Sequence, residues 1–198
     1  MSKTKEVLLF LSDHWADWEA SHAIVGISLS EQYVVKTIAI DKQSKPSIGG
    51  IRAEVDYSIE EYQDFDNLAM LILAGGFSWA ENQYDEVADF VRKTNEAAVP
   101  IAAICGATIF LAKHGFLNKV KHTGDELEYF KEMLKNEEKY KGEEYFSVAQ
   151  VINDGGFITA NETASLEFAC EIFKTLGTST EEEFSSWYKS HKHGMAEK

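Results

Sequence analysis

The sequence has few cysteines, few prolines and no basic excess. Its two cysteines, Cys105 and Cys170, do not form a CxxC pair, so we expect neither a disulfide framework nor a zinc site. The formal net charge of -14 argues against a nucleic acid partner and against an anionic membrane surface. Both partners would require a concentrated basic face.

Long apolar runs are also missing. No run is long enough to span a membrane. The first apolar stretch, residues 7–11, is too short for the core of a signal peptide. We therefore expect a cytoplasmic protein whose cysteines stay reduced.

Short apolar runs alternate with segments of helical periodicity over most of the 198 residues. This alternation predicts an α/β fold, a three-layer sandwich in which helices cover both faces of a mostly parallel sheet. The expected strands are 7–11, 33–40, 68–74, the run after Pro100, 117–122, 145–152 and 157–160, with glycine turns at 47–55 and 153–156. The expected helices follow residue 19 and cover 84–94, 109–114, 125–134 and 163–176.

We expect residues 1–178 to form one domain and residues 179–198 to form a helical tail. Four side chains of the tail share one helical face: Phe184, Trp187, Tyr188 and His191. This face predicts packing on the domain or on the second subunit of a homodimer.

Cys105 stands at the end of a predicted strand, immediately before a predicted helix. This is the layout of a nucleophile elbow, and Ala103 and Ala107 let the two backbones approach closely. Gly106 tolerates the tight turn, and the positive end of the helix favours a thiolate with a lowered pKa. The alternative interpretation is a buried structural cysteine.

Other polar residues follow predicted strands at the same edge of the sheet. Glu19 is a candidate carboxyl partner, although an acidic residue in a first helical turn is also common. Gly75 and Gly76, together with Gly106, can present N–H groups to an oxyanion, or they form a plain turn. His122 is a candidate acid or base, or a surface histidine.

Three residues near Glu19 are candidates for the pocket wall. His14, Trp15 and Trp18 either shape the mouth of the site or pack elsewhere. The sequence shows no metal-ligand spacing and no phosphate-binding loop. We therefore expect no cofactor and no metal, and a small-molecule substrate. Cys170 lies within a predicted core helix and is assigned no chemistry.

Five segments, taken together, carry a family resemblance: 8–19, 71–76, 101–107, 121–123 and 158–164. Through them the chain resembles the ThiJ/PfpI family of the class I glutamine amidotransferase-like superfamily. The resemblance implies a flavodoxin-like fold, with Cys105 as the reactive cysteine and Glu19 as a protonated partner. It also implies an anion pocket at Gly75 and Gly106, and it matches His122 to the histidine of the deglycase branch.

The sequence departs from two branches of this group. The protease branch has a histidine directly after the cysteine, where this chain has Gly106. No His-x-Glu motif follows the elbow helix, as it does in amidotransferases. We therefore predict a cofactor-independent hydrolase, amidase or glyoxalase/deglycase-type enzyme acting on small carbonyl or amide substrates. The alternatives are an oxidative-stress sensor that works through oxidation of Cys105, and a chaperone-like dimer.

Overall fold

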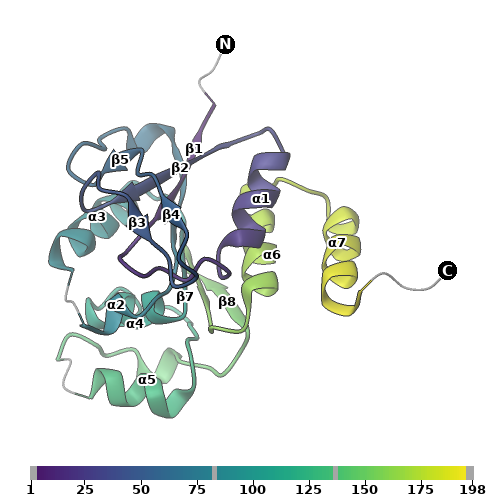
Figure 1. The fold of residues 1–198 in the computed structure, drawn as a ribbon. Coiled ribbons are helices and arrows are strands. Elements are labelled where there is room, and N and C mark those ends of the chain that lie inside the picture. Colours follow the sequence, from purple (N-terminus) through teal and green to yellow (C-terminus); the bar gives the residue numbers. More distant parts are fainter. Residues whose placement is uncertain (1–3, 82–83, 136–137, 195–198) are drawn as a thin grey trace.

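The computed structural model describes residues 4–81, 84–135 and 138–194. Seven strands form one sheet in the order β5-β2-β1-β6-β7-β9-β8 (Figure 1). Every neighbouring pair is parallel except β8 and β9. The strands are β1 (Glu6–Phe10), β2 (Val34–Ala39), β5 (Tyr57–Ser58), β6 (Leu68–Leu73), β7 (Ile101–Ile104), β8 (Val151–Asp154) and β9 (Phe157–Ala160).

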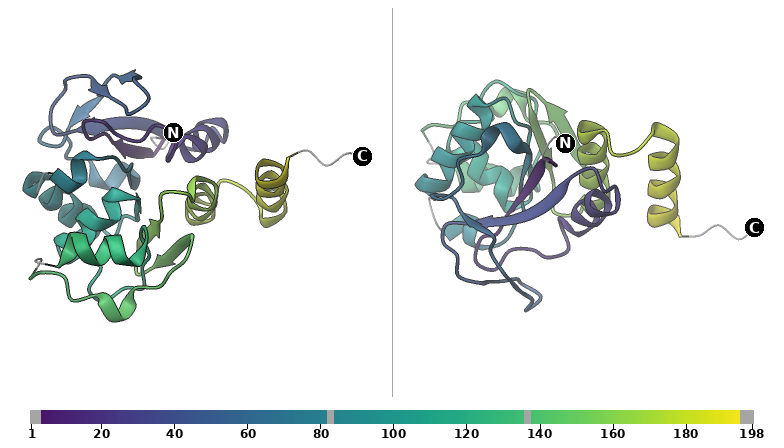
Figure 2. Two further views of the ribbon diagram at one scale, coloured as in Figure 1. Left: turned by 60° about the horizontal axis from the view of Figure 1, so that its bottom comes forward. Right: turned by 90° about the horizontal axis from the view of Figure 1, so that it is seen from above.

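Helices cover both faces of this sheet, so the predicted three-layer α/β fold is confirmed (Figures 1 and 2). One face carries α1 (Ser21–Leu29) and α6 (Ser165–Leu176). The other face carries α2 (Ser78–Glu81), α3 (Asp85–Glu96), α4 (Gly106–Lys113) and α5 (Leu127–Leu134).

The burial of β1 shows why an uninterrupted apolar run was needed. Val7 and Leu9 join the apolar cluster beneath α1 and α6. Leu8 and Phe10 join the cluster on the opposite face. Because successive side chains of a strand point to opposite faces, a strand with helices on both sides is apolar along nearly its whole length, and in β1 the exception is its first residue, Glu6.

Two segments predicted to be strands have a different conformation in the structure. Residues 117–122 form turns, and His122 makes only an isolated bridge with Phe146. The segment 145–152 begins with the 3-10 helix η2 (Glu143–Tyr145) and reaches the sheet only at β8. Residues 117–122 have no place beside β7, because β6 and β9 already pair with both of its edges.

Both predicted glycine turns connect antiparallel strands. β3 (Lys45–Pro46) pairs with β4 (Arg52–Ala53), and β8 pairs with β9. Gly155 and Gly156 connect the second pair with φ of 56° and 87°, the left-handed conformation that a two-residue hairpin turn requires.

The last helix, α7 (Glu181–His193), packs against α6 and has no buried residue (Figure 1). Thr180 and Glu183 form a capping box at its start. The Trp187 ring lies 5.5 Å from the Phe173 ring, and the Tyr188 hydroxyl donates to Glu167 Oε1 at 2.6 Å. Within the described part of the chain, no helix has the length and apolar character needed to cross a membrane.

Candidate active site

Cys105 lies at the sharp turn between β7 and α4, as the elbow pattern predicts. Its backbone has φ 56° and ψ −129°, a conformation that costs a non-glycine residue roughly 1–3 kcal/mol. Three hydrogen bonds hold it: Cys105 N donates to Ala160 O at 3.0 Å, and Thr108 N and the Thr108 hydroxyl donate to Cys105 O at 2.9 and 2.7 Å. Cys105 is half-buried, so part of the residue at this strained turn remains accessible to solvent.

Small residues around the elbow allow close backbone approach. A Cβ atom at position 106 would lie 2.8 Å from Gly76 O and 3.3 Å from Trp79 Cβ. A Cβ atom at position 75 would lie 2.3 Å from Glu19 Oε2 and 2.7 Å from Cys105 Cβ. This backbone therefore leaves no room for the adjacent histidine of the protease branch.

Glu19 is completely buried, although it precedes α1 in a position where carboxylates are usually solvated. Its Oε2 accepts a hydrogen bond from Gly75 N at 2.8 Å. Its Oε1 is buried and has no partner at hydrogen-bond geometry among the residues that the structure describes. A carboxyl with one unpartnered buried oxygen favours the protonated form, because burial penalises the charge.

Burial raises the pKa of Glu19 from 4.5 to about 7, against the opposing effects of the Cys105 thiol and the Gly75 N–H. The pKa of Cys105 is also raised, first by burial and then by the neighbouring Glu19 and Asp125. The Gly106 N–H acts in the opposite direction. The expected thiolate with a lowered pKa is thus not produced by the helix end alone, because burial and two carboxyl groups outweigh it.

The site therefore acts as a coupled acid pair. The charge of Glu19 disfavours the Cys105 thiolate, whereas the Cys105 thiol favours the ionised carboxyl of Glu19. Because the pKa of the thiol lies above that of the carboxyl, Glu19 loses its proton first, and the ionised carboxyl then lies beside a thiol that still holds its proton. Glu19 is therefore suited to accept the thiol proton at the moment of reaction.

Asp125 and Glu162 were missed by the sequence reasoning. One oxygen of each and Cys105 Sγ all lie within 4.8 Å of one another. Asp125 Oδ1 accepts a hydrogen bond from Glu162 N at 2.9 Å, and burial raises the pKa of Asp125. Glu162 follows β9, which lies beside β7, so its position at the same sheet edge as Cys105 could have revealed it. Among the described residues, this trio is the group whose donor atoms are close enough to share a metal ion.

His122 is buried among aromatic rings rather than directed at the thiol. Its Nδ1 lies 2.8 Å from Val120 O, and its Nε2 lies 2.9 Å from the Tyr140 hydroxyl. Burial lowers its pKa, as expected for an imidazole packed against Phe130 and Phe146. Both ring nitrogens thus have partners other than Cys105, and this geometry gives no support to His122 as the base.

The environments of Gly75, Gly76 and Gly106 differ from those expected of an anion pocket built from free N–H donors. The Gly75 N–H is used by Glu19, so Gly75 shapes the site instead of offering a free donor. Gly76 has φ 143°, and a Cβ there would lie 2.5 Å from His14 O. The Gly106 N–H is directed at the Cys105 sulfur, where it favours the anionic form.

The three candidates for the pocket wall have different environments. Trp15 is buried in the apolar core, and its backbone forms bridges with Ser47 and Gly76. His14 and Trp18 are exposed, and Trp18 is 49% accessible. Trp15 therefore belongs to the apolar core and pairs with the glycine loop through its backbone.

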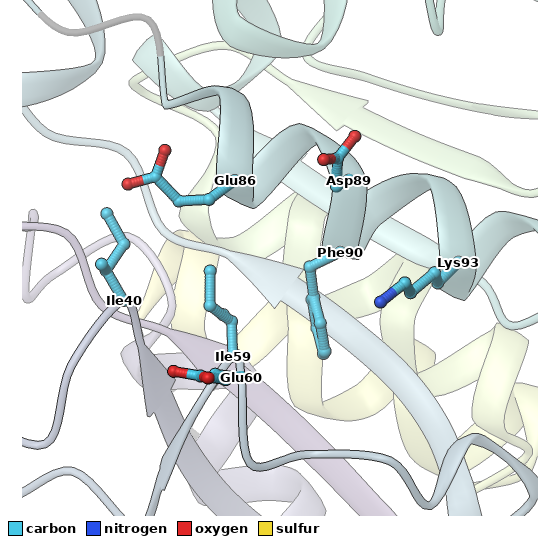
Figure 3. Close-up of a pocket in the computed structure, with 7 residues that line it drawn as sticks. All are labelled: Ile40, Ile59, Glu60, Glu86, Asp89, Phe90 and Lys93. Carbon is cyan, nitrogen blue, oxygen red and sulfur yellow. The ribbon is translucent and has the colours of Figure 1, made fainter.

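A separate groove of about 360 Å³ lies between the ends of β2 and β5 and helix α3 (Figure 3). Its lining residues are Ile40, Ile59, Glu60, Glu86, Asp89, Phe90 and Lys93. None of them belongs to the group around Cys105, so this groove has no part in the chemistry described above.

Comparison with known proteins agrees with this geometry. The chain matches the DJ-1/PfpI family over residues 5–175. Two Bacillus subtilis (strain 168) proteins are similar to it. The uncharacterized protease YdeA is 34% identical, with 96% of this chain and 93% of YdeA aligned. The uncharacterized protease YoaZ is 31% identical, with 96% and 92% aligned.

Solved structures show the same relationship. The thiJ/pfpI family protein from Bacillus anthracis superposes with a TM-score of 0.88 at 31% identity, covering 98% of this chain and 92% of its own. Oxidized DJ-1 from Toxoplasma gondii shares the fold, with a TM-score of 0.74 at 15% identity, covering 95% of this chain and 97% of its own. On these matches and on the elbow cysteine, the chain belongs to the DJ-1/PfpI family.

Proposed function

We propose that this protein is a cofactor-independent enzyme in which Cys105 attacks small carbonyl or amide substrates, in the manner of a glyoxalase, deglycase or hydrolase. The observation that carries the proposal is the pairing of a strained, half-buried Cys105 with the buried Glu19 carboxyl. Strain at the elbow and a proton acceptor beside the thiol are two features that nucleophilic catalysis needs.

The first step follows from this pair. Glu19 takes the thiol proton, and the Cys105 sulfur forms a bond to the carbonyl carbon. The π electrons of the C=O bond move to the oxygen, which then receives the proton from Glu19. The Gly106 N–H, which faces the sulfur, stabilises the thiolate before the attack. With an amide, the O–H proton would next pass to the leaving nitrogen while the C–N bond breaks and the C=O bond re-forms, which gives a free amine and a thioester. Water would then hydrolyse the thioester to a carboxylic acid and restore the thiol.

Oxidation sensing is the second candidate, and one observation favours it. A protonated Glu19 with its unpartnered Oε1 could donate a hydrogen bond to a Cys105 sulfinate. The two other carboxyl groups within 4.8 Å of the sulfur oppose it, because a sulfinate would add a permanent negative charge there. We therefore favour reaction with carbonyl or amide substrates.

Peptidase activity of the adjacent Cys-His kind is not part of the proposal, because position 106 has no room for a side chain. The proposal includes a reducing, cytoplasmic setting, since Cys105 must remain a thiol to react. A homodimer, with α7 near its interface, is a further part of the proposal.

The test is a comparison of initial rates on methylglyoxal and on a small amide. The wild type is expected to turn over one of them, and Cys105→Ser should lose at least 1,000-fold, an order of magnitude typical for removal of a nucleophile. Cys170→Ala is the matched control, because Cys170 is the other cysteine and is buried in α6. Equal turnover by wild type and Cys105→Ser would refute the proposal.

A further inference from the structure

A cavity of about 210 Å³ opens between the start of α5 and the loop after β9. Its lining includes three acidic residues, Asp125, Glu126 and Glu162. The remaining lining residues are Gly124, Val148, Ala149, Asn161 and Thr163, so no lysine or arginine balances this charge within the lining. The cavity is thus an acidic recess.

Two of these carboxylates connect the recess with the nucleophile. Oxygens of Asp125 and Glu162 lie within 4.8 Å of Cys105 Sγ and of each other. The hydrogen bond from Glu162 N to Asp125 Oδ1, at 2.9 Å, joins these two lining residues. A molecule bonded to the sulfur would therefore contact this acidic wall.

A third carboxyl completes the arrangement. Glu19 Oε1 is fully buried next to Cys105 and has no hydrogen-bond partner among the described residues. The other oxygen, Oε2, lies 2.3 Å from the position that a Cβ atom at Gly75 would take, and Cys105 Cβ lies 2.7 Å from it, so the carboxyl stands beside Cys105. Cys105 does not itself line the recess, but three carboxyl groups lie around its sulfur, and two of them, Asp125 and Glu162, belong to the lining.

Electrostatics then distinguishes between substrates of similar size. A charge held about 5 Å from a carboxylate in a partly buried site changes an equilibrium or rate by roughly tenfold per carboxylate. A positive group on the substrate gains this factor, and a negative group loses it. Selection by charge is thus a direct consequence of the two side chains.

We propose that Asp125 and Glu162 make the Cys105 site select substrates that carry a cationic group, an ammonium or a guanidinium, close to the reactive carbonyl or amide carbon. The inference rests on the proposed function, since selection at the sulfur presupposes that Cys105 reacts. The bond-forming step is the addition described above, in which the substrate oxygen takes the thiol proton by way of Glu19. Carbonyl acids, which carry a carboxylate at this position, are disfavoured.

Charged methanethiosulfonates test this selection without any assumption about turnover. In this reaction the sulfur of Cys105 forms a disulfide with the reagent, methanesulfinate leaves with the electron pair, and the thiol proton is released. The probes are the 2-(trimethylammonium)ethyl and 2-sulfonatoethyl reagents, with the neutral methyl reagent as the third. Rates at Cys105 are followed by mass spectrometry of peptides, and 2-mercaptoethanol provides the reference ratio for a free thiol.

The ratio of the cationic to the anionic rate is expected to exceed that of the free thiol by at least tenfold. This ratio should fall towards that of 2-mercaptoethanol in the double variant Asp125→Asn/Glu162→Gln. It should also fall near 1 M salt, where the screening length is about 3 Å. Because any change in thiol pKa affects all three reagents alike, it cancels in this ratio. Glu126→Gln is the matched control, since Glu126 lines the recess outside the group within 4.8 Å of the sulfur.

The outcomes separate the two proposals. If the wild type reacts normally at Cys105 but its ratio of cationic to anionic rate equals that of 2-mercaptoethanol, the charge selection is overturned and the proposed function stands. An elevated ratio that persists in the double variant also overturns it, because the selection would come from other groups. No reaction of Cys105 with any of the three reagents overturns the proposed function together with this inference.

Discussion

Gly75 N donates a hydrogen bond to Oε2 of Glu19 at 2.8 Å, and this contact ties a buried carboxyl to the loop that follows β6. The glycine is required there, because a Cβ atom would lie 2.3 Å from the same oxygen. Its consequence is a carboxyl group held beside the Cys105 thiol, with one oxygen satisfied and the other directed into the site. The chemistry proposed for this protein depends on that arrangement.

The first prediction concerns stability. The pKa of Glu19 is raised from 4.5 to about 7, so between these values the folded state holds a proton that the unfolded state releases. The free energy of unfolding therefore decreases as pH rises through this window, by about 3 kcal/mol in all. Glu19→Gln keeps an acceptor for Gly75 and has no charge to bury, so it should be more stable than the wild type at pH 8.

This advantage should shrink towards zero by about pH 5, where the wild-type carboxyl is protonated when folded. Urea unfolding at both pH values measures it. Glu162→Gln, which changes an exposed carboxylate near the same thiol, is the control and should show a much smaller effect. A Glu19→Gln variant that is destabilised equally at pH 5 and pH 8 would contradict the buried-acid interpretation.

The second prediction concerns position 106. Gly106→His places a side chain where a Cβ atom alone meets Gly76 O at 2.8 Å. Overpacking of this kind typically costs about 1–3 kcal/mol, so the variant should be less stable than the wild type and gain no peptidase activity. Gly106→Ala adds only the Cβ and serves as the graded control. Casein hydrolysis by a stably folded Gly106→His protein would show that the elbow can hold the protease arrangement.

The third prediction concerns His122, whose ring nitrogens pair with Val120 O and the Tyr140 hydroxyl. His122→Asn removes at least one of these buried hydrogen bonds, so we expect a loss of about 1–3 kcal/mol in the free energy of unfolding. The rate at which Cys105 reacts with iodoacetamide should stay within about threefold of wild type at pH 7, because the thiol has a different proton acceptor. A drop of 100-fold in a folded variant would restore His122 as the base. Tyr140→Phe removes the hydroxyl partner of His122 and keeps the imidazole. It therefore separates the effect of this hydrogen bond on stability from any role of His122 in proton transfer.

Much of the fold and part of the site could be predicted from the sequence, for a physical reason. The apolar runs of β1, β6 and β7 are buried on both faces, and the carboxyl ends of parallel strands share one edge. Glu19, Gly75 and Cys105 all follow such strands, so their meeting was foreseeable. The environment of His122 was not, because it depends on Tyr140 and Phe146 in loops without regular periodicity.

Asp125 and Glu162 escaped prediction for a similar reason. They are 37 positions apart, and their meeting at Cys105 depends on the path of the loop after His122 and on β9 pairing with β7. Local composition contains neither fact. The pKa of the thiol was also misjudged, because the helix end was visible in the sequence and the burial and the two carboxyl groups around the sulfur were not.

The central claim is that Glu19 accepts the proton of Cys105, and the pH dependence of Cys105 alkylation tests it most directly. In the wild type, the iodoacetamide rate at Cys105 should rise with pH through an inflection near 7, where the carboxyl loses its proton and becomes able to accept that of the thiol. In Glu19→Gln this inflection should vanish, and the rate should keep rising towards the higher pKa of the isolated thiol. Identical profiles for the two proteins, with the inflection near 7 retained in Glu19→Gln, would contradict the account.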